Sequence, residues 1–182
     1  MNINIILPYK ETYSEELAGA VSLLIAEVKN RCKFKKNIKI FGSLILKKPL
    51  TKDYISCDLS DKPFYYIFGR TSYYLKNIKK KISKKSIIEI HNRPQAAIFF
   101  INNNNNNNNK IILYFHNDPL TLRGSKYVYQ RIHLLKNLDK LIFVSEWTKR
   151  QFFKDLPVKD SEKSFVIYPG SNLLKKIPKK KK

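Results

Sequence analysis

Glycine and cysteine are scarce in this chain, and their scarcity excludes several kinds of site. The 182 residues include only five glycines, and these form neither a GxGxxG nor a GxxxxGK[ST] pattern. A dinucleotide-binding fingerprint and a P-loop are therefore both unsupported. The two cysteines, Cys32 and Cys57, form no CxxC pair, so we expect free thiols in a reducing compartment. The three histidines show no metal-ligand spacing, and we expect neither a metal nor a cofactor.

Long apolar runs are also missing. No run reaches the roughly 18–20 residues that a membrane-spanning helix needs. The N-terminus lacks a positive segment followed by an apolar one, so a secretory signal is not expected. Hydrophobic residues nevertheless make up 43% of the chain, which is enough for a globular domain with a core. These features predict one cytoplasmic domain.

Acidic residues are few: 14 stand against 36 basic ones, which gives a net charge of +22. Such a charge favours an anionic substrate, an anionic membrane surface or nucleic acid as partner. Only six of the basic residues are arginines, the type best suited to bidentate phosphate and base recognition. Lysine occurs together with abundant Ile, Tyr and Asn, a composition typical of AT-rich genomes. We interpret the charge as mainly compositional, with peripheral binding to the inner face of a membrane as the second interpretation and nucleic acid as the least favoured.

Short apolar strands alternate with amphipathic helices along the chain. The predicted strands cover residues 2–7, 38–46, 86–90, 111–115, 141–144 and 164–167. The predicted helices cover residues 14–31, 71–82, 95–101 and 125–138, and Ser145 caps a further one. Strands that are apolar on both faces, alternating with helices, predict an α/β fold with a Rossmann-like, doubly wound, mostly parallel sheet. We expect a single domain over residues 1–172, followed by a basic linker or disordered tail over residues 173–182.

Several local expectations accompany this fold. Helical spacing predicts one buried stripe on the first helix, formed by Leu17, Val21, Leu24, Ile25 and Val28. The same reasoning buries Val128, Ile132, Leu135 and Leu138 on the helix over residues 125–138. Residues 47–63 are expected to be irregular, and Trp147 to lie in the core. The eight asparagines over residues 102–109 are expected to form a solvated loop on the rim opposite the functional site.

Polar residues follow the strands at the positions where such sheets bind ligands, the carboxyl ends. Two tetrads end in proline: His91-Asn92-Arg93-Pro94 and His116-Asn117-Asp118-Pro119. Each imidazole can bond to a sugar hydroxyl or a phosphate oxygen. Asp118 can orient a histidine or act as a base. The alternative is that both tetrads are strand-end turns with helix caps.

Two further segments belong to the same predicted rim. Gly19 and Ala20 follow the first strand, where small residues let a ligand or a second domain approach the backbone of a helix N-terminus. Their alternative role is close packing of helix on sheet. Ser145 is expected to cap a helix, and Lys149 and Arg150 either reach a phosphate or are solvated.

In their order and spacing these segments resemble the N-terminal domain of GT-B glycosyltransferases of family 4, the retaining type found in lipopolysaccharide and other glycan assembly. The matching segments are residues 18–22, 88–94, 115–119, 143–149 and 166–172. The resemblance implies an acceptor-binding domain in which His116 contacts the donor sugar or helps the reaction, and Gly19 lies near the donor diphosphate and the acceptor. The last segment departs from the family, which usually has an Asn-Gly pair, a valine and an aspartate where this chain reads Tyr168-Pro169-Gly170-Ser171-Asn172.

The family's second domain, which binds the nucleotide-sugar through a basic pair and spaced glutamates, has no counterpart here. The resemblance therefore predicts a hexosyltransferase half that acts on a glycan or lipid-linked acceptor only when a C-terminal domain, on a separate chain, completes it. Alone it is expected to be inactive, because transfer needs donor and acceptor in one closed cleft. The alternatives are a non-catalytic basic module that binds anionic membrane or nucleic acid, and an inactive truncated remnant. The predicted catalytic residues are His116 and Asp118, and the predicted substrate-binding residues are Gly19, Ala20, His91, Asn92, Arg93, Asn117, Ser145 and Lys149.

Overall fold

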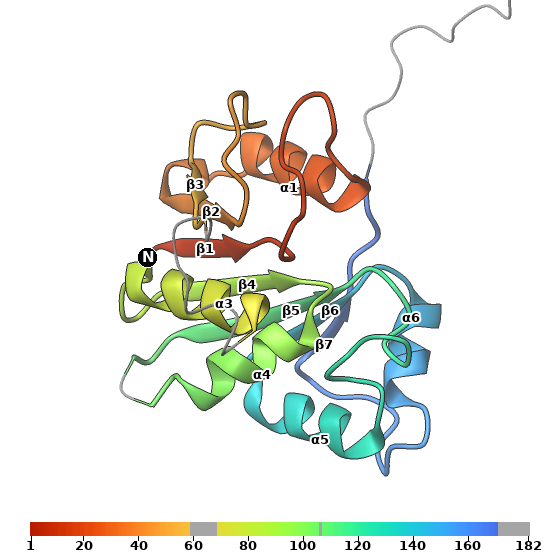
Figure 1. The fold of residues 1–182 in the computed structure, drawn as a ribbon. Helices are drawn as coiled ribbons and strands as arrows, with labels where there is room; N and C mark the ends of the chain where they lie inside the picture. Colours follow the sequence, from red (N-terminus) through yellow and green to blue (C-terminus); the bar gives the residue numbers. More distant parts are fainter. Residues whose placement is uncertain (59–68, 106, 171–182) are drawn as a thin grey trace, which may run out of the picture.

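A computed structural model describes residues 1–58, 69–105 and 107–170, and its centre is a seven-stranded sheet (Figure 1). The order across the sheet is β3-β2-β1-β4-β5-β6-β7, and every neighbouring pair is parallel. The strands are β1 Ile3–Ile6, β2 Ile38–Gly42, β3 Tyr54–Ser56, β4 Ile87–His91, β5 Lys110–Phe115, β6 Lys140–Phe143 and β7 Ser164–Val166. The predicted α/β, Rossmann-like, doubly wound sheet is confirmed. The predicted boundary at residue 172 and the tail over residues 173–182 lie outside the described residues.

Helices cover both faces of this sheet. They are α1 Ala20–Arg31, the short 3-10 helix η1 Lys35–Asn37, α3 Arg70–Lys81, α4 Pro94–Asn102, α5 Val128–Asn137 and α6 Glu146–Phe153. Apolar side chains of α3, α4, α5 and α6 form one large buried cluster with the sheet, whereas α1 packs through Ile25 into a separate cluster with Ile5 and Ile40. The four later helices therefore share one face, and α1 lies on the other (Figure 1).

Stacked aromatic rings hold the larger cluster together. The ring centroids of Phe115 and Phe143 are 5.5 Å apart, and Phe152 of α6 lies 5.4 Å from each of them. All three side chains are fully buried. Burying one such side chain contributes about 1.5–3 kcal/mol, so these rings anchor α6 firmly against β5 and β6.

The centre of the sheet is where the winding direction changes. β1 pairs with β2 on one side and with β4 on the other, so that Ile6 lies opposite both Phe41 and Ile90. In open parallel sheets such a point leaves a crevice at the carboxyl ends of the two strands, where ligands bind. Here that crevice lies beyond Ile6 of β1 and His91 of β4.

The first helix begins later than the sequence predicts. It starts at Ala20 rather than at Ser14, because Ser14 forms an isolated bridge with Pro49 and residues 15–17 form a turn before the helix. Its buried face also differs from the expected stripe, since Leu17 is 74% exposed and Val28 is 54% exposed. The residues that it buries are Ser22, Ile25, Ala26 and Lys29. Lys29 can lie inside because its ammonium pairs with Asp53.

The buried face predicted for α5 is confirmed in part, since Leu138 at its C-cap is buried and Ile132 and Leu135 are half-buried. The helix buries Arg131 and Leu134, while Val128, which was expected inside, is exposed. Arg131 is 1% exposed, and its guanidinium donates to the carbonyls of Ser125, Lys126 and Lys154. A charged side chain is therefore buried next to the predicted apolar stripe, a position that charged residues rarely occupy without partners.

Three other expectations need correction. The stretch over residues 47–58 is not wholly irregular, because it contains edge strand β3, and the rest of that prediction, residues 59–63, lies outside the described residues. Trp147 is half exposed on the first turn of α6 rather than in the core. The asparagine run lies at the amino ends of the strands, but it is not a wholly solvated loop. Asn109 is buried and accepts from both the amide and the hydroxyl of Ser86. Its backbone amide also donates to the side chain of Asn104.

Both cysteines are free, as expected, and burial raises the pKa of the Cys57 thiol. Within the described ranges, none of the helices combines the length and the apolar character needed to cross a membrane.

Candidate functional site

Two histidines meet at the carboxyl ends of β4 and β5. His91 ends β4, and His116 follows Phe115, the last residue of β5. The His91 Nδ1 atom lies 2.9 Å from His116 Nε2, and the His91 Nε2 atom lies 2.7 Å from the Glu89 Oε1 atom. His91 is 3% exposed and stacks on Tyr114 with ring centroids 4.7 Å apart. Glu89, His91 and His116 thus form a continuous hydrogen-bonded chain, here called the carboxylate-imidazole chain.

Periodicity along the strand explains why this chain forms. Successive side chains of a strand point to opposite faces, so Glu89 and His91 share one face and Ile88 and Ile90 share the other. The register pairs His91 with Tyr114 on β5, so both project to the same side. Ile5 is paired with Glu89, which places the carboxylate-imidazole chain on the face that α1 covers.

The hydrogen bonds restrict the proton positions of the two rings. A carboxylate can only accept, so His91 Nε2 donates to Glu89. When His91 is neutral, its Nδ1 atom must accept, and His116 then donates from Nε2 and presents an acceptor at Nδ1. When His91 is cationic, it donates to His116, whose Nδ1 atom then carries hydrogen. A single proton therefore decides whether His116 offers a ligand an acceptor or a donor.

His116 itself stays neutral at physiological pH. Burial, together with the neighbouring His91, lowers the pKa of His116 from 6.5 to about 4. Burial and the charge of Glu89 raise the pKa of the adjacent Tyr114, so its phenol keeps its proton. A neutral imidazole beside a phenol and a carboxylate is suited to hydrogen bonding and proton exchange with a hydroxyl group.

We expect the low pKa of His116 to make stability depend on pH. The ring titrates near 6.5 in the unfolded chain and near 4 in the folded one, so below pH 6.5 the unfolded state binds the extra proton. The free energy of unfolding should be unaffected above that pH and fall by about 1–2 kcal/mol as the pH drops toward 4, after allowance for partial exposure.

Urea unfolding of the wild type and of His116→Gln between pH 4 and 8 checks this expectation. The glutamine amide mimics a neutral imidazole and does not titrate. The free energy of unfolding of the variant should therefore lose the part of its pH dependence that His116 causes. His133→Gln, a histidine on α5 outside the pair, should retain it. Parallel curves for the wild type and His116→Gln would contradict the assignment.

Asn92 carries the chain from one face of the sheet to the other. Its φ angle is +55°, a left-handed value that asparagine tolerates better than most residues. Its amide donates to the carbonyl of Tyr114, and its Oδ1 atom accepts from the amide of Asn117. The two tetrads are thereby joined at their second residues. Arg93 follows on the opposite face and donates to the Asn92 carbonyl.

Asp118 shapes the second tetrad. Its carboxylate accepts from the amide of Leu120, and its carbonyl accepts from the amide and the hydroxyl of Thr121. These hydrogen bonds stabilise a turn, and none of them joins Asp118 to a histidine of the described residues. The carboxylate that orients a histidine in this structure is Glu89. A catalytic role for Asp118 stays a prediction.

The other predicted residues are spread along the rim. Gly19 caps α1, and a Cβ at that position would meet the Glu11 carboxylate at 2.8 Å. Ala20 is the first residue of α1. Ser145 caps α6 by accepting from the amide of Thr148, as expected. Lys149 pairs with Asp160, and this bond, followed by that from Ser164, lowers the pKa of Asp160 to about 2.

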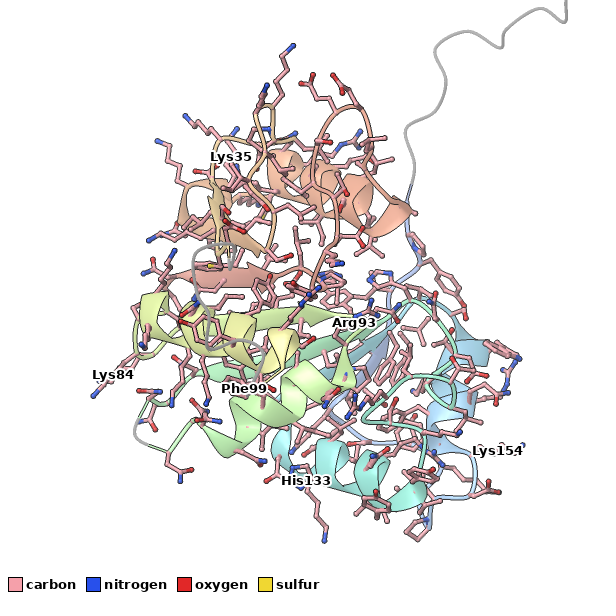
Figure 2. All side chains as sticks on the ribbon, in the orientation of Figure 1. Lys35, Lys84, Arg93, Phe99, His133 and Lys154 are labelled. Carbon is pink, nitrogen blue, oxygen red and sulfur yellow. The ribbon has the colours of Figure 1, made fainter. Side chains whose placement is uncertain are left out.

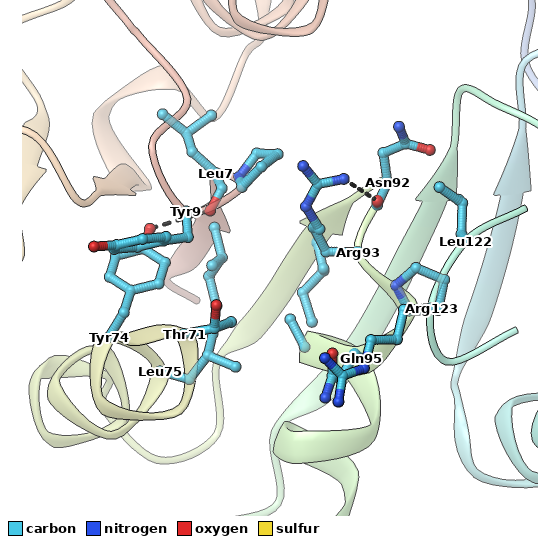
Figure 3. A pocket seen from close by; sticks show the side chains of 15 residues that line it. Leu7, Tyr9, Thr71, Tyr74, Leu75, Asn92, Arg93, Gln95, Leu122 and Arg123 are labelled. Carbon is cyan, nitrogen blue, oxygen red and sulfur yellow. Dashed lines mark hydrogen bonds between the residues drawn. The ribbon is translucent and has the colours of Figure 1, made fainter. Parts of the chain in front are cut away.

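A cavity of about 310 Å³ opens on the other face, at the crevice between β1 and β4 (Figure 3). One side is formed by the segment after β1 and by α3, with Tyr9, Thr71 and Tyr74. The opposite side carries Arg93 and Arg123. Tyr74 donates to the carbonyls of Leu7 and Phe41, and these bonds fix the position of its ring on that first side of the cavity. Of the predicted residues, the cavity unites Asn92 and Arg93 and leaves the two histidines on the far face.

The loop that carries Arg123 is held closely against α4. Gly124 has a φ of +99°, and a Cβ there would lie 2.6 Å from the Gln95 amide nitrogen. Only glycine permits that approach without strain. Ser125 is fully buried and donates to the Pro119 carbonyl. Arg123 is therefore presented from a constrained turn.

Glu89, Tyr114 and Arg123 belong to this region but were not predicted as site residues from the sequence. Glu89 and Tyr114 lie within apolar strands, and their signal is the two-residue spacing that places Glu89 on the His91 face. Arg123 has no local signal, because its position depends on the contact between Gly124 and α4. No group of three or more His, Cys, Asp or Glu side chains in the described part of the chain is arranged to hold a metal ion.

A search of the solved structures finds a similar fold. The crystal structure of Anabaena Alr3699/HepE in complex with UDP and glucose matches with a TM-score of 0.64 over 94% of this chain, at 11% sequence identity. The chain shares the α/β, Rossmann-like fold of the part of HepE that it matches. It spans 45% of the HepE chain. A scan against protein-family models finds no match to the sequence, and neither does a search of the curated proteins.

Proposed function

We propose that this chain is the acceptor-side half of a GT-B glycosyltransferase of family 4. The observation that carries the proposal is the carboxylate-imidazole chain at the carboxyl ends of β4 and β5. It lies on the rim where open parallel sheets bind ligands. The glycosyltransferase-like fold, shared with a protein crystallised with UDP and glucose, supports a nucleotide-sugar as donor.

In the proposed reaction a sugar passes from a nucleotide to a hydroxyl of a glycan or lipid-linked acceptor. The bond between the anomeric carbon and the nucleotide's phosphate oxygen breaks, a bond to the acceptor oxygen forms, and the hydroxyl proton passes to the departing nucleoside diphosphate. His116, neutral and held by His91, is proposed to bond to a hydroxyl of the reacting sugars through Nδ1. Asp118 is the second proposed catalytic residue.

The proposed substrate contacts divide between the two faces. Gly19 and Ala20, at the N-terminus of α1, share their face with His91. Asn92 and Arg93 line the cavity on the opposite face. The remaining proposed contacts on the rim are Asn117, Ser145 and Lys149.

The donor-binding half is proposed to be a C-terminal domain on a separate chain. This chain spans 45% of the length of HepE. Transfer requires both substrates in one cleft, so we expect no turnover from this chain alone. No metal or other cofactor is part of the proposal.

Co-expression tests it directly. The reading frame downstream of this gene should be expressed with this chain, the complex purified, and transfer from a panel of nucleotide-sugars measured by release of the nucleoside diphosphate. We expect turnover by the complex and none by either chain. A complex of verified stoichiometry that shows neither transfer nor hydrolysis would sink the proposal and favour an inactive remnant.

The positive charge of the chain is proposed to assist peripheral binding to a membrane. Lysines point outward on different sides of the molecule, as Lys35, Lys84 and Lys154 illustrate (Figure 2). A diffuse charge of this kind suits weak attraction to the anionic inner face of a membrane better than a defined nucleic-acid groove. We therefore propose a cytoplasmic protein with peripheral membrane contact.

A further inference from the structure

Two arginines line the cavity between β1 and β4. They are Arg93 and Arg123, with the guanidinium of Arg93 beside the Asn92 carbonyl and that of Arg123 beside Gln95 (Figure 3). Its described lining contains no aspartate and no glutamate. Arginine supplies only six of the 36 basic residues of this chain, so a lysine-rich composition does not account for two arginines at one cavity. Positive charge gathered without an acidic partner indicates a site for an anion.

The two guanidinium groups have donors to spare. Arg93 uses one terminal nitrogen for the Asn92 carbonyl. Arg123 makes no hydrogen bond or ion pair within the described residues, where its neighbours in the cavity are Gln95 and Leu122. A guanidinium carries five N–H donors in a planar fork that matches the oxygens of a phosphate. Both side chains are exposed, so they can turn toward a ligand without breaking the core.

The opposite side of the cavity is apolar and aromatic. Tyr9 and Tyr74 have ring centroids 5.7 Å apart, and Leu7 and Leu75 complete the surface. The Tyr74 hydroxyl is already committed to two backbone carbonyls. The Tyr9 ring is partly exposed and offers a face to a sugar ring or a lipid chain. A volume of about 310 Å³ suits one small ligand group rather than a long glycan.

We infer that this cavity binds a phosphate group of the acceptor, with Arg93 and Arg123 as its ligands and Tyr9 against the adjoining sugar or lipid. The acceptor role rests on the proposed function, whereas the anion site can be tested without it. The inference adds Arg123, Tyr9 and the anionic nature of the acceptor to the proposed contacts.

Binding of soluble and lipid phosphates tests the inference. The purified chain is titrated with glucose 6-phosphate, glucose and inorganic phosphate at about 150 mM salt, where charges separated by more than about 8 Å are largely screened. Vesicles with and without phosphatidic acid form the second arm. The test variant is Arg93→Gln/Arg123→Gln. The control is Lys35→Gln/Lys36→Gln, which removes the same charge from η1 at the opposite rim.

We expect glucose 6-phosphate to bind more tightly than glucose, and the arginine variant to lose about tenfold in affinity, as charge-assisted bidentate bonds predict. The lysine control should stay within about twofold. If only phosphatidic acid vesicles show this pattern, the phosphate belongs to a lipid headgroup, and the site stands. Equal losses in both variants, or no loss in the arginine variant, would overturn the inference.

A thermal midpoint like that of the wild type must accompany each variant. The outcome is also separable from that of the proposed function. Loss of transfer in the complete complex with intact phosphate binding argues against the enzyme and not against the site. Intact transfer without arginine-dependent phosphate binding argues against the anion site and not against the enzyme.

Discussion

Replacing Arg131 by methionine is expected to lower the free energy of unfolding by about 3–4 kcal/mol, because three backbone carbonyls lose a charged donor inside the fold. The acceptors are the carbonyls of Ser125, Lys126 and Lys154. Methionine fills much of the vacated space, so most of the loss is polar. Urea unfolding at neutral pH measures it.

Two matched variants make this prediction specific. Arg150→Met removes the same charge from an exposed position on α6 and should change stability by less than about 0.5 kcal/mol. Arg131→Lys keeps the charge but cannot reach all three carbonyls at once, so an intermediate loss is expected. A near-neutral Arg131→Met would show that the carbonyls find other partners.

The effect of Arg131 should extend to the rim. Its three bonds connect α5 to the turn that ends at Ser125 and to the end of α6. That turn carries Gly124 and Arg123, one side of the cavity. The Arg131→Met variant should therefore weaken phosphate binding along with stability, although the residue touches no ligand.

The sheet was predictable because its residues obey one rule. The short strands are apolar on both faces, and only a parallel sheet covered by helices on both sides buries them in that way. The helix faces were less predictable. Lys29 and Arg131 are buried through partners remote in sequence, Asp53 and the Lys154 carbonyl, which periodicity cannot reveal.

The candidate site likewise has residues that could be predicted from the sequence and residues that could not. The two tetrads could be recognised in the sequence as polar residues that follow apolar strands. The structure joins His91 of the first to His116 of the second. The partner of His91 was hidden within a strand as Glu89, while the more conspicuous Asp118 stabilises a turn. Which face each residue occupies depends on the left-handed turn at Asn92, a feature of backbone geometry and not of composition.

The largest expected effect on activity is that of the carboxylate-imidazole chain in the completed enzyme. His116→Ala should reduce kcat by about 100-fold or more, the range typical for loss of a group that exchanges or holds a proton in the transition state. Initial rates of nucleoside diphosphate release from the two-chain complex measure it. Unchanged turnover in His116→Ala would show that this imidazole takes no part in the reaction.

Glu89 acts through His91 and should behave as a positioning residue. Glu89→Gln can still accept from His91 Nε2, but its amide can also donate to that atom, so the ring nitrogen of His91 that carries hydrogen, and with it the proton position on His116, is no longer fixed. We expect kcat to fall about tenfold with KM nearly unchanged, since an amide preserves the shape of the site. The charge-matched control is Glu162→Gln, in an exposed segment before β7.

The pH profile separates this role from a merely structural one. Because the pKa of His116 is about 4, wild-type kcat should stay level from neutral pH down to about pH 5 and fall below it. In Glu89→Gln the midpoint of that fall should move, while the thermal midpoint of the protein at pH 7 should not. A variant that loses activity and stability in parallel, with an unshifted profile, would assign Glu89 to packing alone and leave His116 without its orienting carboxylate.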